Sequence, residues 1–433
     1  MRVLFINQVY WPDVAATAQH ADDLARHLVR HGHEVHVIAS RSLYGSKGAA
    51  LPKRELQPVY DLTIDPAHPE GAEPVGHIHV HRVGMSLFGK SSILARIADF
   101  GFFYLLAMLK AFTVKKPDVV VPFTTPPFIA LVGWLMCTLR GSKYVYWVMD
   151  LYPDLPVACG VMKERALPTR FFEAVNRFCL KRANTAVVLG RCMKERVESK
   201  GVPASNLVHI GVWSPTTADP ESMPAPTPPA DNPYRKEWNL GDRFVVMYSG
   251  NFGLGHDVNT MCNAARALDN EPAWKERVRF LFVGGGKKKA IVERFVREHA
   301  LTNCVLADYQ PRERLSDSLA TADLHLASLL EGVEGIMVPC KLFGIMAAAR
   351  PCVFIGHPSS ELARVLEEHD AGFNVRQGDP DALVGIIKDL AEDPARRAQL
   401  GENAYKALTG AYDRENACTR WRELLERVAA KRA

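Results

Sequence analysis

The sequence predicts an α/β protein built from two doubly wound, parallel-sheet domains that face a cleft. The first observation is length, because 433 residues exceed one ordinary domain and a hydrophobic content of 48% suffices for two cores. The second is that short β-rich runs alternate with longer helical stretches in both halves of the chain. The third is a break in this alternation at residues 214–233, which are rich in Pro, Thr, Ala and Asp.

The first half opens with a predicted buried strand over residues 3–6, followed by a helix over residues 18–31 with Gly32 as its left-handed cap. Helices are also expected over residues 93–114 and 129–139. The remaining predicted strands are residues 35–39, 77–83, 118–121, 144–148 and 185–189. Strands that alternate with helices in this way form βαβ units and a parallel sheet.

The alternation resumes after residue 233, and amphipathic helices occupy residues 380–430. The expected organisation is an N-terminal domain over residues 1–213, a linker over 214–233, a C-terminal domain over 234–410, and a helix over 411–433 that is placed to pack back toward the N-terminal domain. The predicted strands of the second half are residues 244–249, 280–283, 304–306, 324–327 and 352–355.

Charge and cysteine content limit the class of protein. A formal net charge of +5 is far below that of a nucleic-acid-binding chain, so no nucleic-acid partner is expected. The nine cysteines form no CxxC pair, which favours reduced thiols in a cytoplasmic protein over a disulfide framework or a zinc site. The apolar run at residues 3–6 is too short for a signal peptide.

Two glycine-rich turns follow predicted strands of the second half. Such turns allow a ligand to approach the backbone, and a following helix offers amide donors to phosphate; they are also common as purely structural turns. In the second turn, lysines 287–289 oppose the helix dipole unless an anion is present, although a solvated basic face explains most of them equally well. The residues of interest are Gly250, Asn251, Gly253, Gly255 and His256 in the first turn, and Gly284 and Gly285 in the second.

An acidic loop joins the predicted strand at residues 324–327 to a helix of small residues. Glu331 and Glu334 could accept sugar hydroxyls, and Lys341 opens the helix, where it could neutralise a diphosphate. In the first half, Asp150 follows the strand at residues 144–148, where doubly wound sheets carry functional groups. Asp150 could position an acceptor, or it could simply cap the turn before Pro153.

Taken together, these residues resemble glycosyltransferase family 4 of the GT-B fold, specifically the bacterial surface-polysaccharide branch with fucosaminyltransferase-like enzymes. The resemblance spans nearly the whole chain and rests on the order and spacing of motifs. The motifs are Tyr10-Trp11-Pro12-Asp13, Asp150-Leu151-Tyr152-Pro153, Gly201-Val202-Pro203, Tyr248-Ser249-Gly250-Asn251, Gly284-Gly285-Gly286, Tyr309-Gln310-Pro311, Val338-Pro339-Cys340-Lys341 and Ala349-Arg350-Pro351.

The resemblance implies two Rossmann-like domains and a retaining hexosyl- or N-acetylhexosaminyl-type transferase. It would use a nucleotide-diphosphate sugar without a metal or other cofactor, with the donor in the C-terminal domain. The acceptor would be lipid-linked, on a polyprenyl diphosphate, or a saccharide, in O-antigen or capsule synthesis. The expected catalytic residues are Asp150, Lys341 and Glu334. The expected donor-binding residues are Gly250, Asn251, Gly253, Gly255, His256, Gly284, Gly285, Tyr309 and Glu331.

The chain departs from the family pattern at several positions. Asn251 and His256 stand where an Arg and a Lys usually hold the diphosphate, and Ile336 and Gly344 stand where two glutamates are usual. Glu331 and Glu334, just upstream, could take the place of those glutamates. Residues 15–17, Ala-Ala-Thr, replace the usual glycine pair of the N-terminal domain.

Three other functions are compatible with parts of this pattern. A GT-B sugar-nucleotide epimerase would bind the same nucleotide without an acceptor. A non-catalytic sugar-nucleotide-binding protein would explain the altered phosphate site. A dinucleotide-dependent dehydrogenase is disfavoured, because Lys289 stands where the GxGxxG fingerprint needs its third glycine.

The stretch at residues 93–112 is nearly apolar all round and has a basic fringe. Arg96, Asp99 and Lys110 interrupt it, so a membrane span is not expected. One interpretation is a core helix, and the other is a helix that rests on an anionic membrane surface. The second predicts peripheral attachment to the inner face of the cytoplasmic membrane through residues 90–116, which include Lys90, Lys115 and Lys116.

Overall fold

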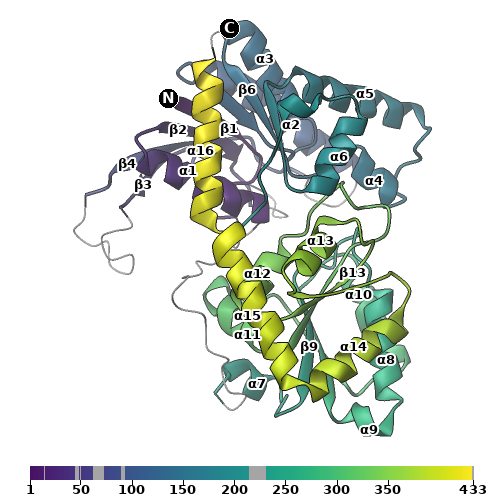
Figure 1. The fold of residues 1–433 in the computed structure, drawn as a ribbon. Helices are drawn as coiled ribbons and strands as arrows, with labels where there is room; N and C mark the ends of the chain where they lie inside the picture. The colour runs from purple at the N-terminus through teal and green to yellow at the C-terminus, as the bar shows by residue number, and fades with distance from the viewer. Residues whose placement is uncertain are drawn as a thin grey trace. The chain divides into compact units, whose positions relative to one another are not determined.

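The computed structural model describes residues 1–13, 15–43, 48, 50–61, 73–88, 93–213 and 231–431 (Figure 1). The chain divides into two compact units. Unit 1 comprises Met1–Val157, Met162–Val212 and Glu415–Ala433, and unit 2 comprises Ala158–Val161 and Trp213–Arg414. The chain thus builds most of unit 1, then unit 2, and returns to unit 1 with its last helix.

Most of the predicted linker, residues 214–230, lies outside the described residues. Asn232, near its end, is 1% exposed and accepts hydrogen bonds from the amides of Tyr234 and Arg235, so it caps the helix α7 (Pro233–Glu237) of unit 2. The last residues of that stretch therefore belong to a folded helix start.

Within the described residues, unit 1 contains an eight-stranded sheet in the order β3-β4-β2-β1-β5-β6-β7-β8. Every pairing is parallel except that of β3 with β4. The central strand β1 is a continuous apolar run because both faces of the sheet are covered. The strands are β1 (Arg2–Ile6), β2 (Glu34–Ser40), β3 (Arg54–Val59), β4 (Gly76–Val83), β5 (Val119–Pro122), β6 (Lys143–Val148), β7 (Thr185–Val188) and β8 (Leu207–His209).

The helices of unit 1 follow the predicted alternation. Gly32, just beyond the first helix, has φ +77°, as its predicted role as a left-handed cap requires. The helices are α1 (Ala16–Arg30), α2 (Ile93–Thr113), α3 (Ala130–Arg140), α4 (Asp154–Ala158), α5 (Leu167–Arg182), α6 (Arg191–Ser199), the 3₁₀ turn η1 (Ala204–Asn206) and α16 (Arg414–Ala430).

The C-terminal helix α16 is part of the core of unit 1 (Figure 1). Trp421 is fully buried, and its ring centroid lies 4.3 Å from that of Trp147 in β6. Arg420 donates a hydrogen bond to the carbonyl oxygen of His209 in β8 at 2.7 Å. Because a buried Trp–Trp contact removes a large apolar area from water, α16 is held firmly against this sheet.

Helix α2 has one buried and one exposed apolar face. Phe103, Ala107 and Ala111 pack into the core, whereas Leu105 and Leu109 are 52% and 54% exposed. The core-helix interpretation therefore holds for only one side of α2. No helix in the described part of the chain is long and apolar enough to cross a bilayer.

Within the described residues, unit 2 contains a six-stranded parallel sheet in the order β11-β10-β9-β12-β13-β14. Strands β9 and β13 have the bounds that the sequence predicts. The strands are β9 (Phe244–Ser249), β10 (Val278–Val283), β11 (Cys304–Ala307), β12 (Leu324–Ser328), β13 (Cys352–Ile355) and β14 (Gly372–Val375).

One core cluster of unit 2 joins the sheet to helices α8 and α14. Val246, Phe280 and Val353 on the strands pack with Met261 and Leu383 on those helices. The remaining elements of unit 2, besides α7, are α8 (Asn259–Asp269), α9 (Pro272–Lys275), α10 (Lys289–Glu298), η2 (Arg312–Arg314), α11 (Leu315–Ala320), α12 (Lys341–Ala347), α13 (Glu361–Glu368), α14 (Pro380–Glu392) and α15 (Pro394–Ala411).

Candidate functional site

The strand order of unit 2 reverses at β9. From β9 the chain moves outward to β10 and β11, and then crosses to β12 on the other side of β9. In doubly wound sheets, ligands bind at such a reversal, beyond the carboxyl ends of the strands. The loops after β9, β10 and β12 are joined there: the amide of Phe252 donates to Gly285 at 2.7 Å, and the amide of Leu330 donates to Gly255 at 2.8 Å.

The glycines of the first two loops allow the loops to touch. Gly284 has φ +126°, and a Cβ there would lie 2.1 Å from the carbonyl oxygen of Gly250. A Cβ on Gly286, at φ +129°, would lie 2.8 Å from the carbonyl oxygen of Phe252. No side chain fits at such distances, so the Gly284–Gly250 contact requires glycine. The sequence predicts glycines that approach a ligand, and the structure shows that they also approach each other.

Lys341 extends from the start of α12 to the loop after β9. Its ammonium group donates hydrogen bonds to the hydroxyl of Tyr248 and, at 3.1 Å, to the carbonyl oxygen of Asn251. A Cβ on Gly250 would lie 3.0 Å from the Cε of Lys341, so glycine at this position leaves room for the lysine. Among the described residues, no carboxylate pairs with this ammonium group, so its charge is not neutralised.

Burial lowers the pKa of Lys341 to about 7. An ammonium group that has lost its water and has no anionic partner favours the neutral form. A bound diphosphate would supply the missing anion and favour the protonated form. The protonation state of Lys341 therefore depends on whether an anion lies beside it.

His256 is buried and carries no charge at neutral pH, because burial, with Lys341 as a smaller cause, lowers its pKa to about 3. Its Nδ1 lies 2.5 Å from the carbonyl oxygen of Ser328, which can only accept, so Nδ1 carries the proton. His256 therefore cannot replace the cation that is usual in the resembled family, and it leaves Nε2 as a hydrogen-bond acceptor.

Two amides of the loop after β9 have no acceptor within the described part of the protein. Within the described residues, the amides of Gly253 and Gly255 donate to no protein acceptor. The amide of Thr260 in the first turn of α8 is already bonded to the carboxylate of Asp257 at 3.0 Å. The amides without an acceptor therefore lie in the loop, whereas an amide of the following helix is taken by Asp257, which lies just before α8.

The two acidic residues after β12 have different surroundings. Glu331 is exposed and forms an ion pair with Arg376 at 2.7 Å. Glu334 is half-buried, and its carboxylate accepts a hydrogen bond from the amide of Gly332 at 2.7 Å. Glu334 thus stabilises its own turn through the amide of Gly332. Glu331 instead contacts Arg376 in the loop after β14.

The positions of the two missing family glutamates are apolar. Ile336 is fully buried, and a Cβ on Gly344, inside α12, would lie 3.4 Å from the side chain of Leu319. A carboxylate at position 336 would be buried among apolar side chains, whereas a Cβ at position 344 would make an ordinary contact with Leu319.

Tyr309, which follows β11, packs on the loop after β10. A Cβ on Gly285 would lie 2.9 Å from the Tyr309 ring, and the Tyr309 hydroxyl donates to the carbonyl oxygen of Gly285 at 3.3 Å. Tyr309 is 59% exposed.

Asp150 belongs to unit 1, whose strand order reverses between β1 and β5. It lies just beyond the carboxyl end of β6, and its amide donates to the hydroxyl of Thr124 after β5 at 3.3 Å. Burial raises the pKa of Asp150 to about 6, which makes the carboxylate a stronger base than an ordinary aspartate. The structure does not place Asp150 in the same unit as Lys341 and Glu334.

Sequence reasoning missed two residues of the unit 2 site. Tyr248, whose hydroxyl accepts a hydrogen bond from Lys341, is fully buried near the end of β9. The sequence feature that could have identified it is a polar hydroxyl near the end of an otherwise apolar strand. Lys288 donates to the carbonyl oxygen of His256 at 2.6 Å and so braces the loop after β9. The sequence could not single out Lys288, because it lies within a run of three lysines.

Two family models match successive parts of the chain. Residues 16–213 match the glycosyl transferase 4-like domain, and residues 231–407 match the glycosyl transferases group 1 domain. The chain is 29% identical to WbjE of Pseudomonas aeruginosa, named as a glycosyltransferase, over 70% of this chain and 74% of that protein. It is 24% identical to WcaI of Escherichia coli (strain K12), named as a glycosyl transferase of colanic acid biosynthesis, over 96% of this chain and 97% of that protein.

Solved structures show the same fold at lower sequence identity. Sucrose-phosphate synthase from Thermosynechococcus elongatus matches with a TM-score of 0.75 and 16% identity, over 99% of both chains. HepE from Anabaena, solved with UDP and glucose, matches with a TM-score of 0.67 and 16% identity, over 98% of this chain and 99% of that chain. The two parallel-sheet units are thus those of a GT-B protein, and the chain belongs to the glycosyltransferases that join a 4-like domain to a group 1 domain.

Proposed function

We propose that this chain transfers a sugar from a nucleotide-diphosphate sugar, with retention of anomeric configuration, to a lipid-linked or saccharide acceptor of bacterial surface polysaccharide, as in O-antigen or capsule synthesis. The observation that carries the proposal is the unneutralised ammonium group of Lys341 at the strand reversal of unit 2. The sugar would be a hexose or an N-acetylhexosamine.

The donor site is proposed to hold the diphosphate with one cation and several loop donors. Lys341 supplies the charge, and the amides of Gly253 and Gly255 supply hydrogen bonds. As the bond between the sugar and the diphosphate breaks, negative charge gathers on the leaving phosphate, and donors fixed in advance stabilise that state. The UDP and glucose bound by HepE support a donor of this class.

The other predicted residues take supporting roles in this proposal. Gly250, Gly284 and Gly285 shape the loops, and Asn251 holds Lys341 through its carbonyl oxygen. Neutral His256 can accept a hydrogen bond, while Glu331 and Glu334 are the carboxylates available to sugar hydroxyls. Tyr309, an exposed aromatic side chain beside Gly285, is proposed to contact the nucleotide or the sugar.

Retention requires that the acceptor attack from the face that the diphosphate leaves. We propose that the leaving phosphate itself takes the acceptor proton, and that Asp150 positions the acceptor hydroxyl. The raised pKa of Asp150 supports this role, because a stronger base forms a stronger hydrogen bond to that hydroxyl. No metal or other cofactor takes part, since Lys341 and the loop amides offset the diphosphate charge.

The relatives and α2 support the proposed acceptor class and location. WcaI is named for colanic acid synthesis, which supports a surface-polysaccharide acceptor. Among the described residues, the exposed apolar face of α2, with Lys115 and Lys116 beyond its end, supports attachment to the inner face of the cytoplasmic membrane. Lys90 lies outside the described residues.

The test is an assay of the purified chain with UDP-, GDP-, dTDP- and ADP-sugars and polyprenyl-diphosphate-linked or free saccharide acceptors. A new glycosidic bond, whose anomeric configuration NMR shows to match that of the donor, would support the proposal, and activity in excess EDTA would support the metal-free step. Conversion of the donor without an acceptor would indicate an epimerase. Donor binding without turnover would indicate a sugar-nucleotide-binding protein.

A further inference from the structure

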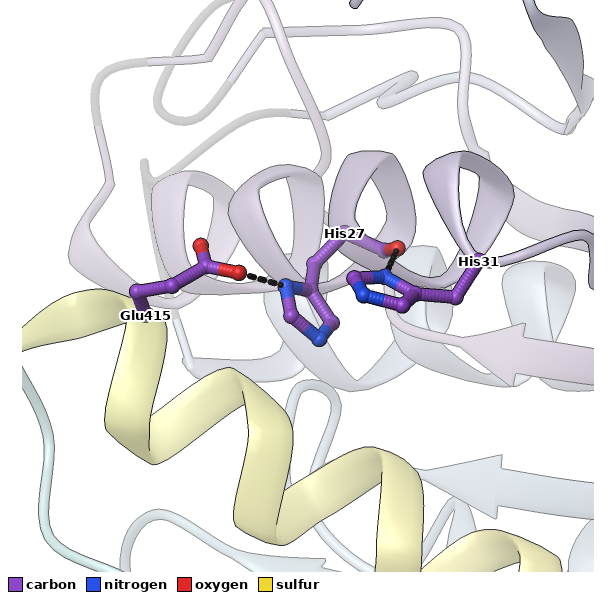
Figure 2. Close-up of side chains that lie close together, drawn as sticks. All are labelled: His27, His31 and Glu415. Carbon is purple, nitrogen blue, oxygen red and sulfur yellow. Dashed lines mark hydrogen bonds and ion pairs between the residues drawn. The ribbon is translucent and has the colours of Figure 1, made fainter. Parts of the chain in front are cut away.

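Two histidines and a glutamate of unit 1 form a cluster that the glycosyltransferase function does not use. His27 and His31 lie four residues apart on α1, so they share one face of the helix. Glu415, at the start of α16, faces them (Figure 2). One ligand atom from each residue lies within 4.8 Å of the others.

The hydrogen bond of His31 sets its ring for a metal. Its Nδ1 lies 2.9 Å from the carbonyl oxygen of His27, and this oxygen can only accept, so Nδ1 carries the proton (Figure 2). Nε2 then keeps its lone pair. Metal-binding histidines have this arrangement, because one ring nitrogen donates to a carbonyl or carboxylate while the other binds the ion.

His27 is a buried side chain with unmet hydrogen bonds. It is 2% exposed, and within the described residues neither of its ring nitrogens has a hydrogen-bond partner of suitable direction. Its Nδ1 nevertheless lies 2.9 Å from a carboxylate oxygen of Glu415, as in an ion pair. A buried polar atom without a partner is unfavourable, and a cation between the imidazole and the carboxylate would provide a partner for the ring nitrogen that it binds.

The third group has the charge that a cation needs. The Glu415 side chain is 57% exposed, and a glutamate in contact with water is negatively charged at neutral pH. The rings of His27 and His31 have centroids 4.3 Å apart, and they lie on the side of α1 that faces Glu415 (Figure 2).

We propose that His27, His31 and Glu415 bind one divalent transition-metal ion of the Zn²⁺ type. Two imidazoles and a carboxylate form a donor set suited to this ion, and water would complete the coordination. Tetrahedral ligands at about 2.0–2.1 Å lie roughly 3.3 Å apart, so side-chain adjustments of about 1.5 Å would close the site.

The ion would have a structural role. Glu415 is the first residue of the segment that returns to unit 1, whereas α1 is the first helix of that unit. A metal bound to both would link the two ends of the unit 1 chain and stabilise the folded form that contains α16, because the unfolded chain holds no formed site. Lys341 belongs to unit 2, so the inference does not depend on the proposed sugar transfer.

The test starts from metal-free, full-length protein titrated with Zn²⁺ in a calorimeter and with Co²⁺, whose visible absorption reports tetrahedral coordination. One equivalent should bind, and the thermal unfolding temperature should rise. His31→Ala and Glu415→Gln, both at exposed positions, should each weaken binding roughly tenfold or more, since even outer-shell changes at metal sites cost about 10–100-fold.

Glu426→Gln is the matched control. Glu426 is another carboxylate of α16, and it contacts a single histidine, His33, at 2.9 Å. The Glu426→Gln variant should bind metal as the unmodified chain does. Circular dichroism should show that all variants are folded. The proposal is overturned if Zn²⁺ at micromolar concentration does not bind. It is also overturned if His31→Ala and Glu415→Gln bind undiminished, or if Glu426→Gln weakens binding equally.

Discussion

The ammonium group of Lys341 lies 3.8 Å from the centre of the Tyr248 ring and donates a hydrogen bond to the hydroxyl of the same tyrosine. The hydroxyl in turn donates to the carbonyl oxygen of Asn251 at 3.1 Å. An aromatic face and neutral oxygens hold a cation in place without cancelling its charge. A carboxylate in their place would have left no net charge for a diphosphate.

The first prediction concerns the size of the contribution of Lys341. Lys341→Ala should lower kcat/KM for sugar transfer. The loss should correspond to about 2–4 kcal/mol of transition-state stabilisation, the usual cost of removing one fixed donor. The protein should stay folded, because no ion pair is lost. Steady-state kinetics, with thermal unfolding as the folding check, measure both quantities.

Lys287→Ala is the control for that variant, because Lys287 is an exposed lysine of the same unit. Its kinetics should match those of the unmodified chain. Equal losses in both variants would show that general positive charge matters, and not the placement of Lys341.

The second prediction follows from the pKa of Lys341, which is about 7 in the free protein. Because a diphosphate binds the protonated form, affinity for a nucleotide sugar should be full below pH about 7. Above it, affinity should fall by up to about tenfold per pH unit, until the raised pKa of the complex is passed. Calorimetry in buffers of different ionisation enthalpy would also detect the proton taken up on binding.

Lys341→Arg tests the same mechanism in the opposite direction. A guanidinium stays charged throughout this range, so the variant should bind without that slope, whatever its absolute affinity. A slope that persists in Lys341→Arg would assign the titration to another group.

The third prediction concerns the contact between the two glycine loops. Gly284→Ala places a Cβ 2.1 Å from the carbonyl oxygen of Gly250 at a φ of +126°. Overpacking and backbone strain together should destabilise the protein by about 2–6 kcal/mol, and nucleotide-sugar binding should weaken as the loops separate. Chemical denaturation and donor titration measure the two effects.

Gly385→Ala provides the contrast. Gly385 lies inside α14, has no atom within 4 Å of a built Cβ, and has no left-handed φ. Alanine there should stabilise the helix by about 0.5–1 kcal/mol. A Gly284→Ala variant as stable as Gly385→Ala would contradict the described loop contact.

The fourth prediction concerns Asp150, whose pKa is raised to about 6. If the ionised carboxylate positions the acceptor, kcat/KM for the acceptor should fall as pH drops below about 6. Asp150→Asn should abolish this fall in kcat/KM at low pH and should reduce kcat/KM itself roughly 100-fold. Donor affinity should be unchanged. Asp154→Asn should instead lower stability, because Asp154 pairs with Lys200 at 2.8 Å, and should keep the fall at low pH.

The fifth prediction concerns the exposed apolar face of α2. The chain should float with liposomes that contain anionic lipid, and added salt should weaken binding. Reversing the charges of Lys115 and Lys116 together should reduce binding roughly tenfold or more, at about 1 kcal/mol per lysine. Leu105→Glu, in the exposed face, should also reduce it.

Leu167→Glu is the control for the apolar face. Leu167 is 79% exposed and begins α5, away from α2 in the sequence. It should leave liposome binding unchanged. Failure of the unmodified chain to bind anionic liposomes at low salt would remove the membrane role.

The strands that the sequence predicted and those that it missed differ in burial. Strands such as β1 and β9 are covered on both faces, and their continuous apolar runs identify them. The missed strand β3, at a sheet edge, has exposed residues at every second position, Arg54, Leu56 and Pro58, so it lacks a continuous apolar run. β14, at the other edge, begins with Gly372 and has few fully buried residues.

The sequence by itself determined the two α/β units and the glycine loops after β9 and β10, because apolar runs and turn residues occupy consecutive positions in the chain. It also singled out Lys341 as a candidate, since this lysine opens a helix after a loop. Only the tertiary structure decided that Lys341 rests on Tyr248, that His256 is neutral, and that His27 faces Glu415. These contacts join strands and helices distant in the chain. Their charge states depend on burial, which only the packed structure creates.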